Sequence, residues 1–179
     1  MVRITKLIVA ATFAAMAMGS QSATAGDNAN AEVTVSLVDA LEITKESDVQ
    51  LGAIIKPKGS SSLMHLSHDN ARTLSSGDAV LQPSTYGAAS FTVSGNSGVA
   101  YNVEFVGTSG SANGLVMKHI SATCTNGVWS GNGLNRTLTG CTSYGKDALK
   151  VAASIDISPS STAKGSVNAG SIKVMIAYQ

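Results

Sequence analysis

The chain has 179 residues, of which 44% are hydrophobic and 13% charged, with 12 Lys and Arg against 11 Asp and Glu. This length suits one domain with a single buried core. The charges are scattered rather than clustered, which gives no electrostatic basis for binding nucleic acid or an anionic membrane.

The first 25 residues are typical of a cleavable secretory signal peptide. Arg3 and Lys6 precede an apolar run at residues 7–19, and an A-x-A site occupies residues 23–25. These three features define such a signal, and a 13-residue apolar run is shorter than the roughly 20 residues of a membrane span. We expect cleavage before Gly26, export by the general secretory pathway through the periplasm, and a final location at the cell surface or outside the cell.

An alternating segment follows the signal peptide. Its apolar residues are Ala31, Val33, Val35 and Leu37, and polar residues lie between them. This pattern predicts an extended strand with one apolar face. We therefore divide the chain into a signal peptide at 1–25, an N-terminal arm or first strand at 26–37, and a β-sandwich domain at 38–179.

Period-two alternation also predicts strands at 99–105, 149–158 and 171–178. Weaker patterns predict strands at 41–44, 49–55, 63–67, 79–82, 89–94 and 115–124. In the last strand, the residues expected to face the core are Ile172, Val174, Ile176 and Tyr178. About ten short strands with Gly-, Ser- and Asn-rich joints, and no amphipathic helical pattern, predict an all-β fold. The expected architecture is an antiparallel immunoglobulin-like β-sandwich.

The two cysteines, Cys124 and Cys141, both follow the signal peptide. In an oxidising compartment they are expected to pair as a structural disulfide. The Gly- and Asn-rich residues 125–140 are then a long excursion closed at its base by this bond. In the chain-entropy model a loop of this length stabilises the fold by about 3 kcal/mol.

The histidines offer a candidate metal site, which the pattern does not favour. His65 and His68 lie three residues apart beside Asp69, with His119 the only other histidine. Residues three apart on a strand point to opposite faces, so His65 and His68 do not share a site unless the chain turns there. We expect ordinary polar histidines, no metal and no cofactor.

We also expect no enzymatic activity, because the serines lack a Gly-x-Ser-x-Gly elbow and the carboxylates form no recognisable pair. Trp129, the only tryptophan, lies in the Gly-rich excursion. Two roles are open for Trp129: it stacks on a sugar as an exposed aromatic, or it covers the disulfide. We favour the second, because aromatic side chains are more commonly used for the area that they bury.

Three blocks of sequence resemble a bacterial secreted family known as domain of unknown function 4402. They are residues 31–54 (AEVTVSLVDALEITKESDVQLGAI), the pair 87–95 (GAASFTVSG) and 99–105 (VAYNVEF), and residues 169–178 (AGSIKVMIAY). The resemblance implies a small exported β-sandwich similar to fimbrial subunits, with an N-terminal arm before the first sheet strand and a tyrosine second from the end, here Tyr178. The cysteines lie late in the chain, unlike the early disulfide of the commonest chaperone-usher pilins.

The leading functional hypothesis is a pilin-like structural subunit of a cell-surface fibre, assembled by strand exchange. The expected partners are other copies of the chain, with a periplasmic chaperone as a further candidate. An unpaired strand edge in an exported protein invites such β-augmentation. The alternative is a monomeric secreted binding module, for example for carbohydrate, using Trp129 and Tyr144.

Overall fold

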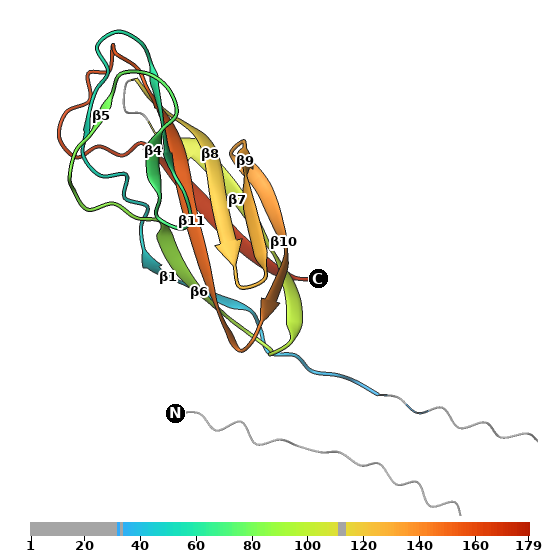
Figure 1. The fold of residues 1–179 in the computed structure, drawn as a ribbon. Helices are drawn as coiled ribbons and strands as arrows, with labels where there is room; N and C mark the ends of the chain where they lie inside the picture. The colour runs from blue at the N-terminus through green and yellow to red at the C-terminus, as the bar shows by residue number, and fades with distance from the viewer. Residues whose placement is uncertain (1–31, 33, 111–113) are drawn as a thin grey trace, which may run out of the picture. The chain divides into compact units, whose positions relative to one another are not determined.

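The computed structural model describes residues 32, 34–110 and 114–179, and within these ranges it contains twelve strands and no helix. The strands are β1 (Glu42–Ser47), β2 (Ile54–Ile55), β3 (Ser62–Leu66), β4 (Arg72–Leu74), β5 (Val80–Leu81), β6 (Ala89–Ser94), β7 (Val99–Ser109), β8 (Leu115–Cys124), β9 (Gly127–Asn132), β10 (Asn135–Ser143), β11 (Lys146–Ile157) and β12 (Gly170–Tyr178). Their pairings are antiparallel, and the predicted all-β sandwich is confirmed (Figure 1). The predicted signal peptide lies outside the described residues, as do Ala31 and Val33.

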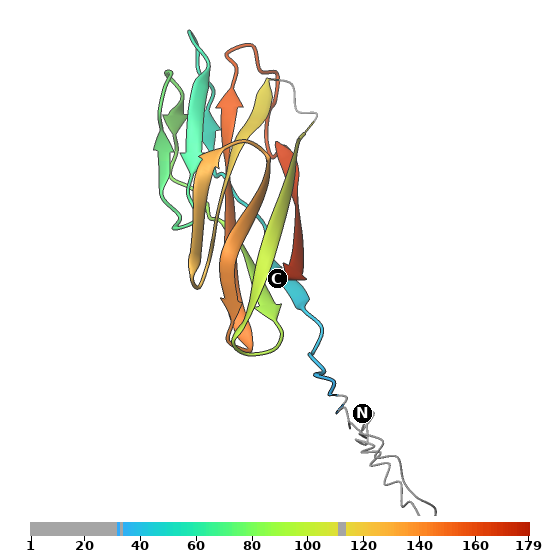
Figure 2. The same ribbon diagram turned by 90° about the vertical axis from the view of Figure 1, so that its right-hand side faces the viewer.

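Two sheets form the sandwich. The larger has the order β1-β6-β11-β3-β4, with β8 on the other edge of β11 and β9 beyond β8. The smaller has the order β10-β7-β12, and in Figure 2 the red β12 lies beside the yellow-green β7. A two-stranded ribbon of β2 and β5 pairs with neither sheet. The end strand β12 therefore pairs with β7 alone among the described residues.

The central strand of the larger sheet is β11, which has three partners. Its first half pairs with β6 and its second half with β3 on one edge, while β8 pairs along the other edge. The predicted alternation holds in the first half, where Leu149 and Val151 are buried and Lys150 is exposed. It fails at Ala152 and Ser154, which are buried although the pattern places them on the polar face. Ala152 packs with the second apolar cluster and Ser154 is hydrogen-bonded to a histidine of β3, so both faces of β11 are covered there.

Apolar side chains from both sheets meet in the main core. Its largest fully buried members, Tyr101 and Phe105, come from β7, as the alternation at residues 99–105 predicts. A second cluster, centred on Met64 and Leu66 of β3, packs against the far half of β11. Half-buried residues near the ribbon complete it, including Leu51 and Leu81.

The predicted excursion at residues 125–140 is wrong, because this segment contains β9 and most of β10. The strand β9 turns back on β8, and β10 crosses to pair with β7 in the other sheet. Its Gly and Asn residues hide the strand pattern, since both are depleted in strands. The short β4 was also missed; it pairs with β3 along three residues only.

The segment predicted at residues 26–37 as an N-terminal arm or first strand forms no strand in its described part. Residues 34–41 have neither strand, turn nor bend, and the first strand begins at Glu42. Val35 and Leu37 are 82% and 88% exposed. An extended segment counts as a strand only when a neighbour satisfies its backbone groups, and no pairing is present here among the described residues.

Candidate functional site

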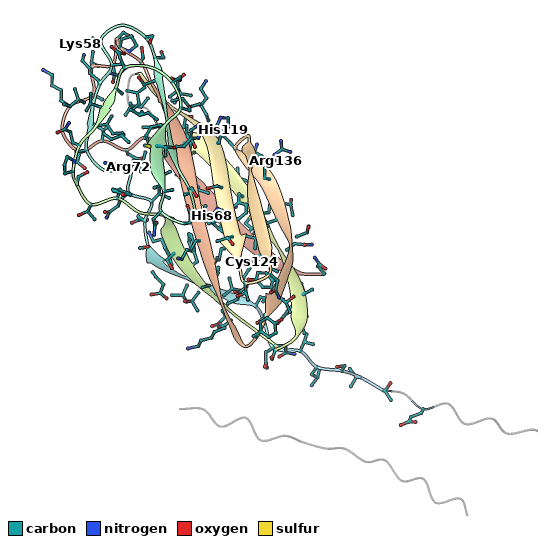
Figure 3. All side chains as sticks on the ribbon, in the orientation of Figure 1. Lys58, His68, Arg72, His119, Cys124 and Arg136 are labelled. Atoms are coloured by element: carbon teal, nitrogen blue, oxygen red, sulfur yellow. A yellow bond between two sulfur atoms is a disulfide. The ribbon has the colours of Figure 1, made fainter. Side chains whose placement is uncertain are left out.

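The disulfide between Cys124 and Cys141 is present, as the sequence predicts. Cys124 ends β8 in the larger sheet (Figure 3), and Cys141 lies on β10 in the smaller one. Both are buried in the main core. The bond therefore ties the two layers of the sandwich together across their interior.

A buried polar cluster lies inside the sandwich. The Tyr101 hydroxyl donates to the Asp147 carboxylate, which also accepts from the backbone N–H and the hydroxyl of Thr125. Burial and the hydrogen bond to Asp147 raise the pKa of Tyr101. Tyr101 and Asp147 are 0% and 2% exposed, so no substrate reaches them. The cluster links β7, β11 and the β8–β9 turn, which is a structural role.

The structure pairs His65 with His119 rather than with His68. His65 on β3 and His119 on β8 flank Ser154 of the intervening β11, and their rings stack with centroids 5.8 Å apart. His65 is also hydrogen-bonded through Nδ1 to Ser154 Oγ at 2.7 Å and through Nε2 to Ser75 Oγ at 3.1 Å. Among the residues that the structure describes, no three His, Cys, Asp or Glu side chains are grouped to hold a metal ion. Sequence reasoning missed this pair because 54 positions separate its members.

The histidine pair predicts a dependence of stability on pH. Burial, and then the neighbouring His119, lower the pKa of His65 below its usual 6.5. The unfolded chain therefore binds this proton at a higher pH than the folded chain, and the free energy of unfolding falls as the pH drops below about 6.5. Stability measured by urea unfolding between pH 7.5 and 4.5 should decline, and His65→Gln should decline less. An identical decline in both proteins would contradict this assignment. The pKa values of Asp69 and Asp78 are lowered, by hydrogen bonds from Ser67 and from backbone N–H groups respectively. The stability that these two carboxylates contribute is present at neutral pH and is lost only in more acidic solution.

The N-terminal arm is anchored at its root, just before β1. The Tyr178 hydroxyl donates to the Asp39 carbonyl at 2.8 Å and accepts from the Asn96 N–H at 3.1 Å. The Asp39 N–H donates to the Asn96 side chain at 3.1 Å. The terminal tyrosine thus fixes the point at which the arm joins the β-domain.

The terminal strand β12 places Ile172, Val174, Ile176 and Tyr178 against the main core, where each is half-buried. Lys173 and Ala177, on its opposite face, are exposed. One edge of β12 is paired with β7. Among the described residues no strand pairs with its other edge, which leaves backbone N–H and C=O groups available there.

An apolar groove of about 1560 Å³ opens beside the start of β12. The volume exceeds the roughly 300–1,000 Å³ usual for small-molecule pockets. Residues 48–54 and 163–172 line it together with Lys45, Lys56, Ser84, Thr85 and Ser161, and the larger sheet contributes Ala89, Phe91, Leu115, Met117, Val151, Ala153, Ile155 and Ile157. Both layers of the sandwich therefore border the groove.

Hydrogen bonds hold the walls of the groove in place. The Arg72 guanidinium donates to the carbonyls of Leu51 and Gln82 and stacks on the Tyr86 ring at 4.3 Å. The Lys56 ammonium donates to the Ser161 carbonyl at 3.0 Å and so joins the two walls. These contacts hold Leu51 and Ser161, which line the groove, in fixed positions.

The alternative hypothesis relies on Trp129 and Tyr144, of which the structure describes the side chain of Tyr144. Tyr144, in the turn between β10 and β11, is 59% exposed and its hydroxyl accepts from Asn126 Nδ2 at 3.1 Å. Trp129 lies in β9, where its backbone pairs with Ala122 of β8. Its side chain lies outside the described part of the chain. In the described part of the chain, the candidate binding surface therefore consists of the exposed Tyr144 side chain.

Comparison with protein families identifies the domain. Residues 41–178 match the model of a family described as a domain of unknown function, DUF4402. The chain belongs to the DUF4402 family. Its DUF4402 domain begins one residue before β1 and ends with β12, so the part of the resembling block 31–54 that precedes Leu41 lies outside the match. Neither the curated proteins nor the solved structures searched include a match to this chain.

The described residues contain no helix of the length and apolar character that crossing a membrane requires.

Proposed function

We propose that this DUF4402 protein is a structural subunit of a cell-surface fibre, and that its subunits are joined by strand exchange through the N-terminal arm. The observation that carries this proposal is the exposure of three apolar side chains just before the domain: Val35 at 82%, Leu37 at 88% and Val38 at 58%. Full burial of a Val or Leu side chain stabilises by about 1.5–3 kcal/mol. Binding of a partner that covers this exposed arm is therefore favourable.

The route to the cell surface is part of the proposal. Residues 1–25 have the pattern of a secretory signal, and the Cys124–Cys141 disulfide is typical of proteins that fold in an oxidising compartment. The subunit then passes through the periplasm, where a chaperone that covers the arm or the groove would prevent premature assembly. The proposed role is structural and requires no catalysis.

A charge placed in the arm tests the proposal. Val35→Asp should abolish high-mass species that resist mild detergent, because assembly would bury an unpaired carboxylate in an apolar site. The midpoint of thermal unfolding of the isolated subunit should stay the same. The matched control is Ser36→Asp, which adds the same charge to the opposite face of the extended arm and should polymerise normally.

Three results would count against the fibre. Unfolding of the Val35→Asp monomer would mean that the arm belongs to its own sheet. Equal polymerisation of both variants would mean that the apolar face of the arm is not used. A wild-type protein that stays monomeric, forms no filaments in negative-stain images of cell-surface material and binds a glycan column would favour the binding module.

A further inference from the structure

We infer that the apolar groove beside β12 is the acceptor site, and that its occupant is the arm of a second copy of this chain. This inference rests on the proposed function and assigns the surface that strand exchange would use. The groove is lined by Phe91, Leu115 and Ile172, which pack only partly buried against the two cores. An inserted strand would complete their burial.

The backbone of the groove suits a strand rather than a compact ligand. Gly170, Ser171 and Ile172 at the start of β12 line it, and β12 has one edge that no strand pairs among the described residues. An added strand satisfies such an edge through main-chain hydrogen bonds, while alternate side chains enter the pockets. The arm presents apolar residues at every second position from Ala31 to Leu37, which is the spacing that this mode requires.

The charges of the two surfaces are complementary. Lys45, Lys56 and Lys164 line the groove, against a single carboxylate, Asp48, which is paired with Lys45 at 2.8 Å. The arm segment from Gly26 to Val38 carries Asp27 and Glu32 and no basic side chain. Opposite charge steers association and sets the register of the partner.

The anchoring of the arm favours a second copy over the same chain. Asp39 is held by Tyr178 at the end of β12, whereas the groove is lined by the residues that begin that strand. Tyr178 lies six positions after Ile172, or about 20 Å along an extended strand. The root of the arm is thus held at the end of β12 away from the groove, and residues 37–41 next to it contain no turn or bend.

Disulfide trapping in the full-length exported protein tests the assignment. Val35→Cys and Leu37→Cys would each be mixed with Ile172→Cys under mild oxidation, after thermal unfolding shows that every variant folds cooperatively. A covalent pair of chains on non-reducing gels is expected for at least one combination. The control acceptor is Lys173→Cys, whose exposed side chain lies on the opposite face of β12 and should trap several-fold less. Should Ile172→Cys not fold, the exposed groove residue Val167 is the second acceptor position.

The outcomes separate this inference from the fibre proposal. Trapping within one chain, in a variant that carries both cysteines, would place the arm in its own groove and overturn the inference. Polymers that form without preferential trapping at Ile172 or Val167 would put the acceptor elsewhere and leave the fibre proposal standing. Absence of polymers under every condition, with no trapping, would overturn both. A synthetic peptide of residues 26–39 should shorten the polymers, while the same peptide with Val35→Asp should not.

Discussion

A chain that ends at residue 170 should be unable to fold, because it loses β12 and with it one side of the main core. The deletion removes Ile172, Val174, Ile176 and Tyr178, all half-buried against that core. At about 1.5–3 kcal/mol for a fully buried side chain, four half-buried ones contribute roughly 3–6 kcal/mol. That loss is comparable with the lower end of the roughly 5–15 kcal/mol stability of a typical domain. It also leaves the edge of β7 unpaired over eight residue positions, which adds unsatisfied backbone groups.

Circular dichroism and solubility after expression would measure the effect of this deletion. The control is Ala177→Ser, which changes an exposed side chain of the same strand. It should fold like the wild type, which would show that a change in β12 is not harmful in itself. A soluble protein that lacks residues 171–179 and unfolds in one cooperative transition would refute the prediction.

Removal of the disulfide, by Cys124→Ala together with Cys141→Ala, should lower the free energy of unfolding by about 2–5 kcal/mol. The bond closes a 17-residue separation and joins β8 to β10 across the core. Its loss increases the conformational freedom of the unfolded chain and also removes the covalent link between the two sheets. Because Cys141 pairs in register with Tyr101, we expect the loss of the bond also to weaken the buried hydrogen bonds of Tyr101 and Asp147.

Urea unfolding monitored by tryptophan fluorescence would give the midpoint and slope for both proteins. The wild type unfolded in the presence of a reductant should match the double variant, since both lack the bond. Free thiols in the native protein, found by non-reducing peptide mapping, would contradict the pairing itself. An unchanged midpoint in the double variant would show that the bond is energetically neutral.

Part of this fold follows from local pattern. Alternation at residues 99–105 predicted most of β7, because a strand with one buried face repeats every two residues whatever its partner. Weaker patterns at residues 89–94 and 115–124 predicted β6 and β8. The last strand was equally visible, since polar and apolar residues alternate up to Tyr178. The disulfide followed from having two cysteines and a signal for export.

The remaining features depend on which strands become neighbours. The stacking of His65 on His119 requires β3 and β8 to flank β11, and the burial of Ala152 and Ser154 requires both faces of β11 to be covered. Backbone pairing turned a Gly- and Asn-rich segment into β9 and β10, although the side chains gave no strand signal.

Local alternation thus determined which residues face inward along a strand, and by itself indicated the apolar arm and the terminal strand. The two cysteines and the export signal indicated the disulfide. The groove that we assign as the acceptor arises only when β6, β8, β11 and β12 converge, because its lining residues come from segments up to 127 positions apart, between Lys45 and Ile172. Hydrogen bonding and packing between distant segments, rather than any local pattern, decided where that surface lies.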